Sequence, residues 1–148
     1  MNLSKRVKVT QAITPTAGAA GTTDINGTIL DMAGWEGVLM EVTFGAITAS
    51  AVTNVHAEQD SSSSMTSAAD LAGTGQTVAD TDDGDIFLID LYRPLERYVR
   101  VVVDRGTANA VVAGATYIQY GGANAKLPPS NGSTVNAEQH SSPAEGTA

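Results

Sequence analysis

Apolar and polar residues alternate along much of this chain, and a period of two is typical of strands that bury one face. The clearest case is the segment 98–105, in which valines at every second position alternate mainly with polar residues. A second apolar run covers residues 86–92, and Arg93 and Pro94 separate the two. Because proline cannot donate to a strand ladder, we expect a corner there, joining two paired core strands with arginines on their outer face.

No window sustains the 3.6-residue period of a helix. Six other segments have strand-like patterning: 4–13, 27–32, 35–47, 48–59, 76–79 and 110–120. The first is expected at a sheet edge, where its lysines discourage aggregation. Turn signals separate the segments at roughly the 8–12-residue spacing of sandwiches and barrels, whereas the serine-rich loop 60–69 is too polar to pack. We predict an all-β fold, a two-sheet β-sandwich of about eight strands, with a jelly-roll as one candidate topology.

The chain divides into one domain and a tail. Residues 1–121 are predicted to form the β-sandwich domain, with residues 1–8 as an N-terminal arm. Residues 122–148 are rich in glycine, proline and small polar residues and contain no aromatic residue. This low-complexity composition does not support a packed core, so we expect an extended C-terminal arm that gains order against a neighbouring subunit.

Composition adds two expectations. The 148-residue chain is only 5% aromatic and much of its apolar content is alanine, so we expect a lean core that partner surfaces help to stabilise. The absence of cysteine excludes disulfides and thiolate metal sites and fits a reducing cytoplasm. No apolar run approaches about 18 residues, so we expect a soluble protein with neither a membrane span nor a secretory signal.

Charge is distributed unevenly. The net charge is −8, and twelve acids but no lysine or arginine lie between Val9 and Tyr92. Such a surface disfavours nucleic acid and suits docking on a basic protein surface or contacts between copies, although plain solubility is an equal alternative. The basic residues at the start of the chain and from residue 93 onward are the predicted interface residues, with ordinary surface ion pairs as the alternative. They are Lys5, Arg6, Lys8, Arg93, Arg97, Arg100, Arg105 and Lys126.

No arrangement of residues indicates catalysis or a cofactor, so a non-enzyme is predicted. His56 and the tail residue His140 are the only histidines, and His56 is expected to face solvent. Spacings typical of transition-metal ligands are absent. The one metal candidate is a weak Ca²⁺ turn, with a plain inter-strand turn as the alternative, because position twelve of the run is Leu91 where an EF-hand requires glutamate. Its acids are Asp80, Asp82, Asp83 and Asp85.

Two short motifs of the chain resemble those of a known protein family. They are Gly-Trp-Glu-Gly at 34–37 and the corner segment from Arg93 to Arg100. Over about residues 30–121 the chain resembles the capsid decoration, cement or minor head proteins of tailed bacteriophages. The resemblance implies a non-enzymatic virion protein, made in the host bacterial cytoplasm, that binds the outside of the capsid. It also implies the major capsid protein and a homodimer or homotrimer as partners, without nucleic acid or membrane.

Two alternatives remain open. A carbohydrate- or receptor-binding module on a head or tail fibre would use aromatic side chains such as Trp35, although a core or rim position is the more common use of tryptophan. A tail-tube or head-completion subunit would share the structural class and differ in copy number.

Overall fold

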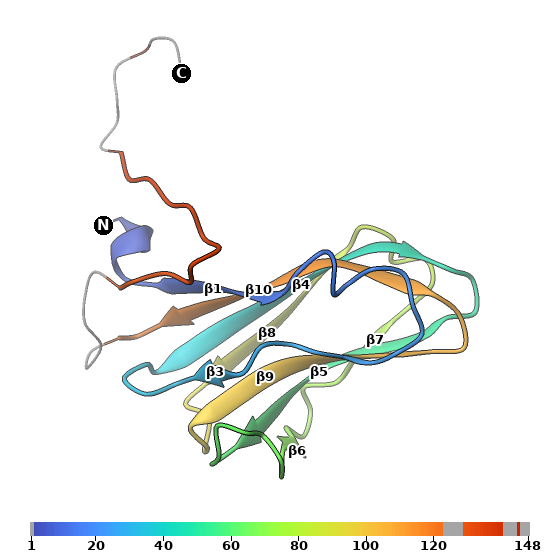
Figure 1. Ribbon diagram of the computed structural model, residues 1–148, viewed down its shortest axis with the longest axis horizontal. Helices are drawn as coiled ribbons and strands as arrows, with labels where there is room; N and C mark the ends of the chain where they lie inside the picture. The colour runs from blue at the N-terminus through green and yellow to red at the C-terminus, as the bar shows by residue number, and fades with distance from the viewer. Residues whose placement is uncertain (1, 123–128, 141–144, 146–148) are drawn as a thin grey trace.

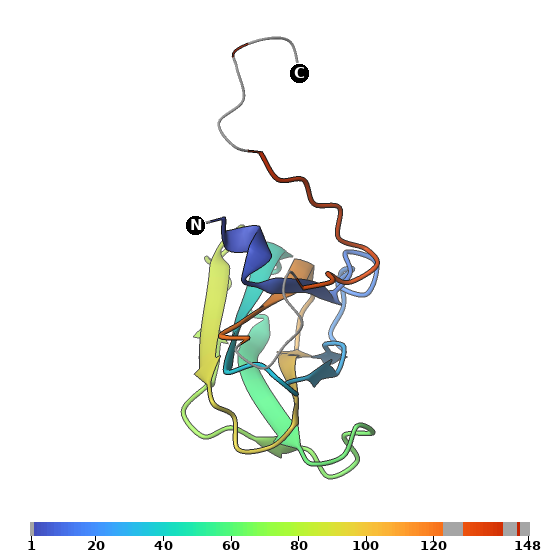
Figure 2. The same ribbon diagram turned by 90° about the vertical axis from the view of Figure 1, so that its left-hand side faces the viewer.

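The computed structural model describes residues 2–122, 129–140 and 145, and it consists of two antiparallel β-sheets packed against each other (Figures 1 and 2). Ten strands occur among these residues, and the single helical element is the 3₁₀ turn η1 at Leu3–Lys5. The described residues contain no helix with the length and apolarity needed to cross a membrane. The prediction of an all-β two-sheet sandwich is confirmed.

The first sheet has four strands, in the order β1 (Lys8–Ile13), β10 (Ala110–Tyr120), β4 (Gly37–Ile47) and β8 (Ile86–Tyr92). The second sheet is centred on β9 (Tyr98–Gly106) and β5 (Val52–Asp60). On one side, β9 pairs with the short strands β2 (Ile25–Asn26) and β3 (Leu30–Asp31). On the other side, β5 pairs with β6 (Ala69–Asp70) and β7 (Gln76–Val78).

Strand order identifies the topology as a jelly-roll. The strands β2 and β3 both pair with β9 and act as one interrupted strand, and β6 and β7 do the same beside β5. Eight strand positions then remain, and the chain crosses between the sheets at almost every connection, so that the first and last strands are neighbours. This arrangement is the double-sheet jelly-roll, and the two interruptions explain why ten strands are found where about eight were predicted.

The core lies between the sheets and follows the predicted alternation. From β4, the side chains of Val38, Met40, Val42 and Phe44 are at most 1% exposed, and the inward valines of β9 are fully buried against them. Phe44 also meets Phe87 of β8 edge to face, at 5.4 Å between ring centroids. Burial of these apolar surfaces is the main stabilising contribution of the fold.

A tyrosine bridges the two sheets where β2 and β3 are interrupted. Gly27 lies in that interruption, and its N–H donates to the carbonyl of Val101 at 2.8 Å. The N–H of Val101 instead donates to the hydroxyl of Tyr117, which reaches across from β10 at 2.9 Å. Burial raises the pKa of Tyr117 far above its usual range, so the hydroxyl stays neutral. A buried backbone group is thereby paired without a neighbouring strand.

The expectation that 86–92 and 98–105 form a pair of core strands is wrong. The strand β8 pairs with β4 at the edge of the first sheet, whereas β9 lies in the centre of the second. The corner between them starts at Arg93, which has a positive φ of 52°, and it carries the chain from one sheet to the other. As an edge strand, β8 exposes every second side chain on its outer face.

Other predicted elements shift at their ends. The first strand begins at Lys8 because η1 occupies the preceding residues, and the strand predicted from residue 48 begins at Val52 after a turn in which Ser50 has a positive φ of 69°. The segment 27–32 contributes only β3, with β2 formed just before it. The serine-rich loop does pack, because Met65 is buried and Asp60 accepts the N–H groups of Ser62 and Ser67.

The described part of the C-terminal tail contacts β1 and then leads away from the sandwich in both views (Figures 1 and 2). Gly132 donates its N–H to the carbonyl of Val9, and the N–H of Val9 donates to Oδ1 of Asn131 at 3.0 Å. The segment thus covers part of the edge of β1, which is an edge strand as predicted. Among residues 129–140 there is no helix or strand.

Candidate functional site

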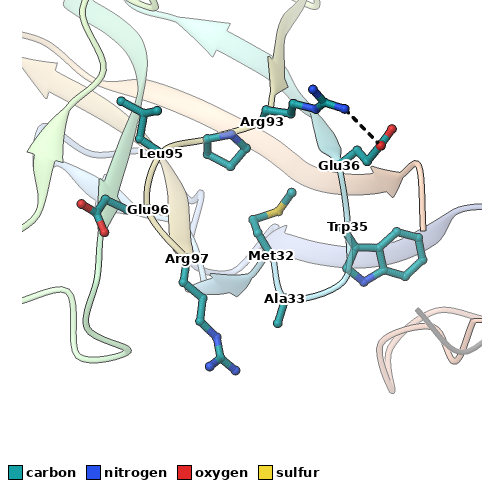
Figure 3. A pocket seen from close by; sticks show the side chains of 9 residues that line it. Met32, Ala33, Trp35, Glu36, Arg93, Leu95, Glu96 and Arg97 are labelled. Atoms are coloured by element: carbon teal, nitrogen blue, oxygen red, sulfur yellow. Dashed lines mark ion pairs between the residues drawn. The ribbon is translucent and has the colours of Figure 1, made fainter. Parts of the chain in front are cut away.

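The corner between β8 and β9 forms the wall of a surface cavity of about 360 Å³. The opposite wall is the connection from β3 to β4, which carries Met32, Trp35 and Glu36. Figure 3 shows Trp35 and Glu36 on one side of this cavity and Leu95 and Glu96 on the other. Backbone hydrogen bonds hold the two connections together, from the N–H of Arg93 to the carbonyl of Glu36 and from the N–H of Met32 to the carbonyl of Arg97.

Both arginines of the corner are paired with acids of the same chain. Arg97 donates to both carboxylate oxygens of Asp31 at 2.9 and 2.7 Å, and this contact lowers the pKa of Asp31 and raises the pKa of Arg97. Arg93 lies 3.5 Å from Glu36, as drawn in Figure 3. All four side chains are largely exposed, so these pairs contribute little to stability. They match the alternative of ordinary surface pairs and leave the guanidinium groups accessible.

The two predicted arginines of β9 differ in environment. Arg100 lies on the outer face of the second sheet, half-buried, with Nε donating to Glu58 at 2.6 Å. Arg105 faces the interior, and its guanidinium donates to the backbone carbonyls of Thr23, Ala19 and Ala110 at 2.7–2.8 Å. Burial lowers the pKa of Arg105. The expectation of an exposed arginine stripe is therefore wrong for Arg105, because its strand position points inward.

The N-terminal basic residues are accessible as well, and they differ from the corner arginines in their pairing. Lys5 and Arg6 are exposed and Lys8 is half-exposed, and none of the three forms an ion pair with another described residue. Lys5 lies beside the C-terminal segment, where Asn131 and Glu138 line a shallow cavity of about 190 Å³ with it. The remaining predicted interface residue, Lys126, lies outside the described residues.

The acidic turn is organised around backbone amides. Oδ1 of Asp83 accepts the N–H of Ile47 at 2.6 Å, Oδ2 of Asp80 accepts that of Ser50 at 2.9 Å, and Asp82 accepts that of Ala79. No three of the four predicted Ca²⁺ ligands, including Asp85, bring carboxylate oxygens within 4.8 Å of one another. The side chains of the turn therefore connect the β4–β5 loop to the β7–β8 loop by hydrogen bonds. This arrangement matches the alternative to a Ca²⁺ site, a plain inter-strand turn.

A mainly apolar row of exposed side chains follows the outer face of β8, is interrupted by Asp90, and continues into the corner. Ile86, Leu88 and Tyr92 are 58%, 51% and 56% exposed, and Leu95 is 91% exposed. We call these four residues the β8 apolar row. The sequence pattern does not show it clearly, because all outward residues of this strand except Asp90 are apolar, like the inward ones, and the contrast between the two faces is weak.

A second cluster lies on the outer face of the second sheet, around His56. Its Nε2 is 3.3 Å from Oδ1 of Asp70 and 3.9 Å from Oε1 of Glu58, and its Nδ1 is 3.2 Å from Oδ2 of Asp104. The side chain of His56 is only 13% exposed, so the prediction of a solvent-facing histidine is wrong, because neighbouring side chains on the sheet surface cover it. The two-residue spacing of His56 and Glu58 predicts that both lie on the same face of a strand. Asp70 and Asp104 come close only because β5 pairs with β6 and β9, and this pairing cannot be predicted from the sequence pattern.

The fold places the chain among the double-sheet jelly-roll proteins. In comparisons with known proteins, no family model, no curated protein and no solved structure matched the chain.

Proposed function

We propose that this chain is a non-enzymatic decoration protein of a bacteriophage capsid, which binds the outside of the shell and bridges major capsid protein subunits. The observation that carries the proposal is the β8 apolar row at the edge of the first sheet. Its three strand residues span roughly 20 Å, because a strand rises about 3.3 Å per residue. Asp90 lies between Leu88 and Tyr92 on the same face, and its carboxylate accepts a hydrogen bond from the hydroxyl of Tyr120. Single exposed apolar residues are ordinary, but a row along a sheet edge is typical of an interaction surface.

The surroundings of the row suit a protein partner. The basic side chain of Arg93 follows Tyr92 directly and lies 5.1 Å from its ring centroid, so an aromatic and a cationic group are presented together. Tyrosine and arginine are enriched at protein–protein interfaces, where they supply contact area and directed hydrogen bonds. The large acid excess between Val9 and Tyr92 adds a repulsion against nucleic acid.

The choice of a capsid as the partner rests on analogy. Jelly-rolls recur in viral capsid domains and also in lectins, so the fold alone does not select a function. The resemblance of residues 30–121 to phage head proteins favours the capsid. A protein that binds only the expanded shell stabilises that state by mass action, and repetition by symmetry multiplies each small contact. Self-association into a dimer or trimer would enlarge each bridging unit.

The test is co-sedimentation with expanded shells assembled from the major capsid protein encoded in the same phage genome. Leu88→Lys places a charge in the centre of the β8 apolar row, and Val52→Lys is the matched control because Val52 is equally apolar and 66% exposed on the other sheet. We expect Leu88→Lys to weaken shell binding at least tenfold, which corresponds to about 1.4 kcal/mol, while Val52→Lys binds normally. Equal binding by both variants would remove the row from the interface.

The carbohydrate-binding alternative has one structural observation in its favour. Trp35 lines the corner cavity together with Glu36, Arg93 and Arg97, which combines an aromatic surface with polar groups as sugar sites do (Figure 3). Binding of the isolated protein to a glycan array, with loss on Trp35→Ala, would support this function and count against the capsid proposal.

A further inference from the structure

The His56 cluster gathers three potential metal ligands at one point of the second sheet. His56 and Glu58 are two residues apart on β5 and share its outer face, and Asp70 of β6 is the register partner of Glu58. The imidazole Nε2 and one carboxylate oxygen from each acid all lie within 4.8 Å of one another. No other group of three such side chains occurs among the residues that the structure describes.

The spacing of these donor atoms fits a small divalent ion. Zinc binds imidazole nitrogen and carboxylate oxygen at about 2.0–2.2 Å in a tetrahedral arrangement, which places neighbouring ligand atoms about 3.3 Å apart. The separation between His56 Nε2 and Asp70 Oδ1 is 3.3 Å, and that to Glu58 Oε1 is 3.9 Å. The ligand oxygens of Glu58 and Asp70 lie within 4.8 Å of each other, and the exposed Asp70 side chain has room to move towards a bound ion. The donor set of one nitrogen and two oxygens favours Zn²⁺ over Ca²⁺ or Mg²⁺, which prefer oxygen alone.

We propose that His56, Glu58 and Asp70 bind a divalent transition-metal ion of the Zn²⁺ type, with water as the fourth ligand. The ion is held through Nε2 of His56, Oε1 of Glu58 and Oδ1 of Asp70. It links β5 to β6 and so fixes the loop between residues 60 and 69 to the sheet.

Two further side chains position the ligands. Asp104 of β9 lies 3.2 Å from Nδ1 of His56, where a carboxylate accepts the ring proton and leaves Nε2 free to bind metal. Arg100 donates to Oε2 of Glu58 at 2.6 Å, so this carboxylate is held by one oxygen and presents the other to the histidine. With a neutral His56, the three acids and Arg100 carry a net charge of −2, which a divalent ion neutralises.

The cluster is also accessible and partly preorganised. The side chains of His56 and Glu58 are 13% and 14% exposed and are held between β6 and β9, so little freedom is lost on binding. Asp70 is 76% exposed and lies on the solvent side, which leaves a route for the ion. Asp70 can also be replaced without disturbing the core.

Titration of the metal-free full chain with Zn²⁺, followed by calorimetry and by the thermal unfolding midpoint, tests the proposal. We expect one tight site, a higher unfolding midpoint with Zn²⁺, and no comparable response to Ca²⁺ or Mg²⁺. Co²⁺ in place of Zn²⁺ should give the visible absorption of a four-coordinate ion. Flat titrations with Zn²⁺ and Co²⁺ would overturn the proposal.

Variants locate the site. Asp70→Asn should lower Zn²⁺ affinity at least about 100-fold, and Asp104→Asn by roughly 10–100-fold, the usual effect of losing an outer partner of a histidine ligand. His56→Gln should abolish binding, and the exposed position of Asp70 keeps the test valid if that variant fails to fold. His140→Gln is the matched control, because His140 also lies 3.1 Å from a carboxylate, that of Glu138. Unchanged binding by Asp70→Asn, or loss only in His140→Gln, would contradict the assignment.

Discussion

Buried polar side chains decide much of the local structure at the scale of single residues. Asp60 ends β5 and is only 6% exposed, yet its carboxylate accepts two backbone N–H groups of the loop that follows. These hydrogen bonds favour the ionised form and lower the pKa of Asp60. A loop that is polar in composition is therefore ordered by one acid, with Met65 as its only buried apolar side chain.

Asp60→Asn should reduce stability most at neutral pH. Because the folded pKa of Asp60 is depressed, its contribution is present above the ordinary carboxylate pKa and is lost as the pH falls through the folded value. The difference in unfolding free energy between the parent protein and Asp60→Asn should therefore be constant near pH 7 and shrink below about pH 4. Urea unfolding at several pH values measures it, with the exposed Asp85→Asn as control. A gap that stays constant down to pH 3 would contradict this role.

At the scale of elements, the sequence pattern predicts the bounds of some strands more closely than those of others. The predicted 110–120 strand coincides with β10, and the predicted 35–47 strand starts two residues before β4, because valines or other apolar residues alternate with polar ones there. The pattern in 86–92 predicts a strand equally well but not its place at a sheet edge. The short β6 and the gap between β2 and β3 depend on pairing with distant strands.

The functional residues were predicted less well than the strands, for a physical reason. An arginine on a strand can face solvent, as Arg100 does, or extend inward to backbone carbonyls, as Arg105 does, and composition does not distinguish them. The His56 cluster needs three strands to come together. The exposure of the β8 apolar row depends on the tertiary structure, in which no described residue covers these side chains.

Arg105→Met should detach the loop between β1 and β2 from the sheets. It removes the donors to three backbone carbonyls, two of which belong to that loop, at Ala19 and Thr23. An unsatisfied buried polar group costs about 1–3 kcal/mol. We therefore expect the free energy of unfolding, measured with urea, to fall by at least roughly 3 kcal/mol. Arg97→Met is the control, and its loss should be far smaller because its ion pair is exposed. Similar losses for both variants would contradict an anchoring role for Arg105.

At the scale of the whole molecule, residues 8–120 form one jelly-roll whose first and last strands lie next to each other. The strands β1 and β10 are neighbours, and the C-terminal segment returns to the free edge of β1 at Val9. The exposed N-terminal lysines and the described part of the tail therefore form one region of the surface. Under the proposed function, this region would supply a second contact to the shell besides the β8 apolar row.

A chain ending at Gly122 separates folding from binding. The shortened protein should fold, because β10 ends at Tyr120. Only two hydrogen bonds join the tail to Val9, so its free energy of unfolding should fall by only about 1–3 kcal/mol. Shells decorated with it should release it at a lower temperature than shells decorated with the full chain. Asn131→Ala in the full chain removes one of these two bonds and should show the smaller loss. Equal binding and equal heat resistance would exclude the tail from the interface.

The central claim is that this jelly-roll is a building part of a capsid. The most direct measurement is a cryo-electron microscopy reconstruction of expanded shells incubated with the full chain. We expect one ordered jelly-roll at each equivalent position of the outer surface, with the β8 apolar row against the major capsid protein. Bare shells, or density confined to a single ring at one vertex, would contradict it.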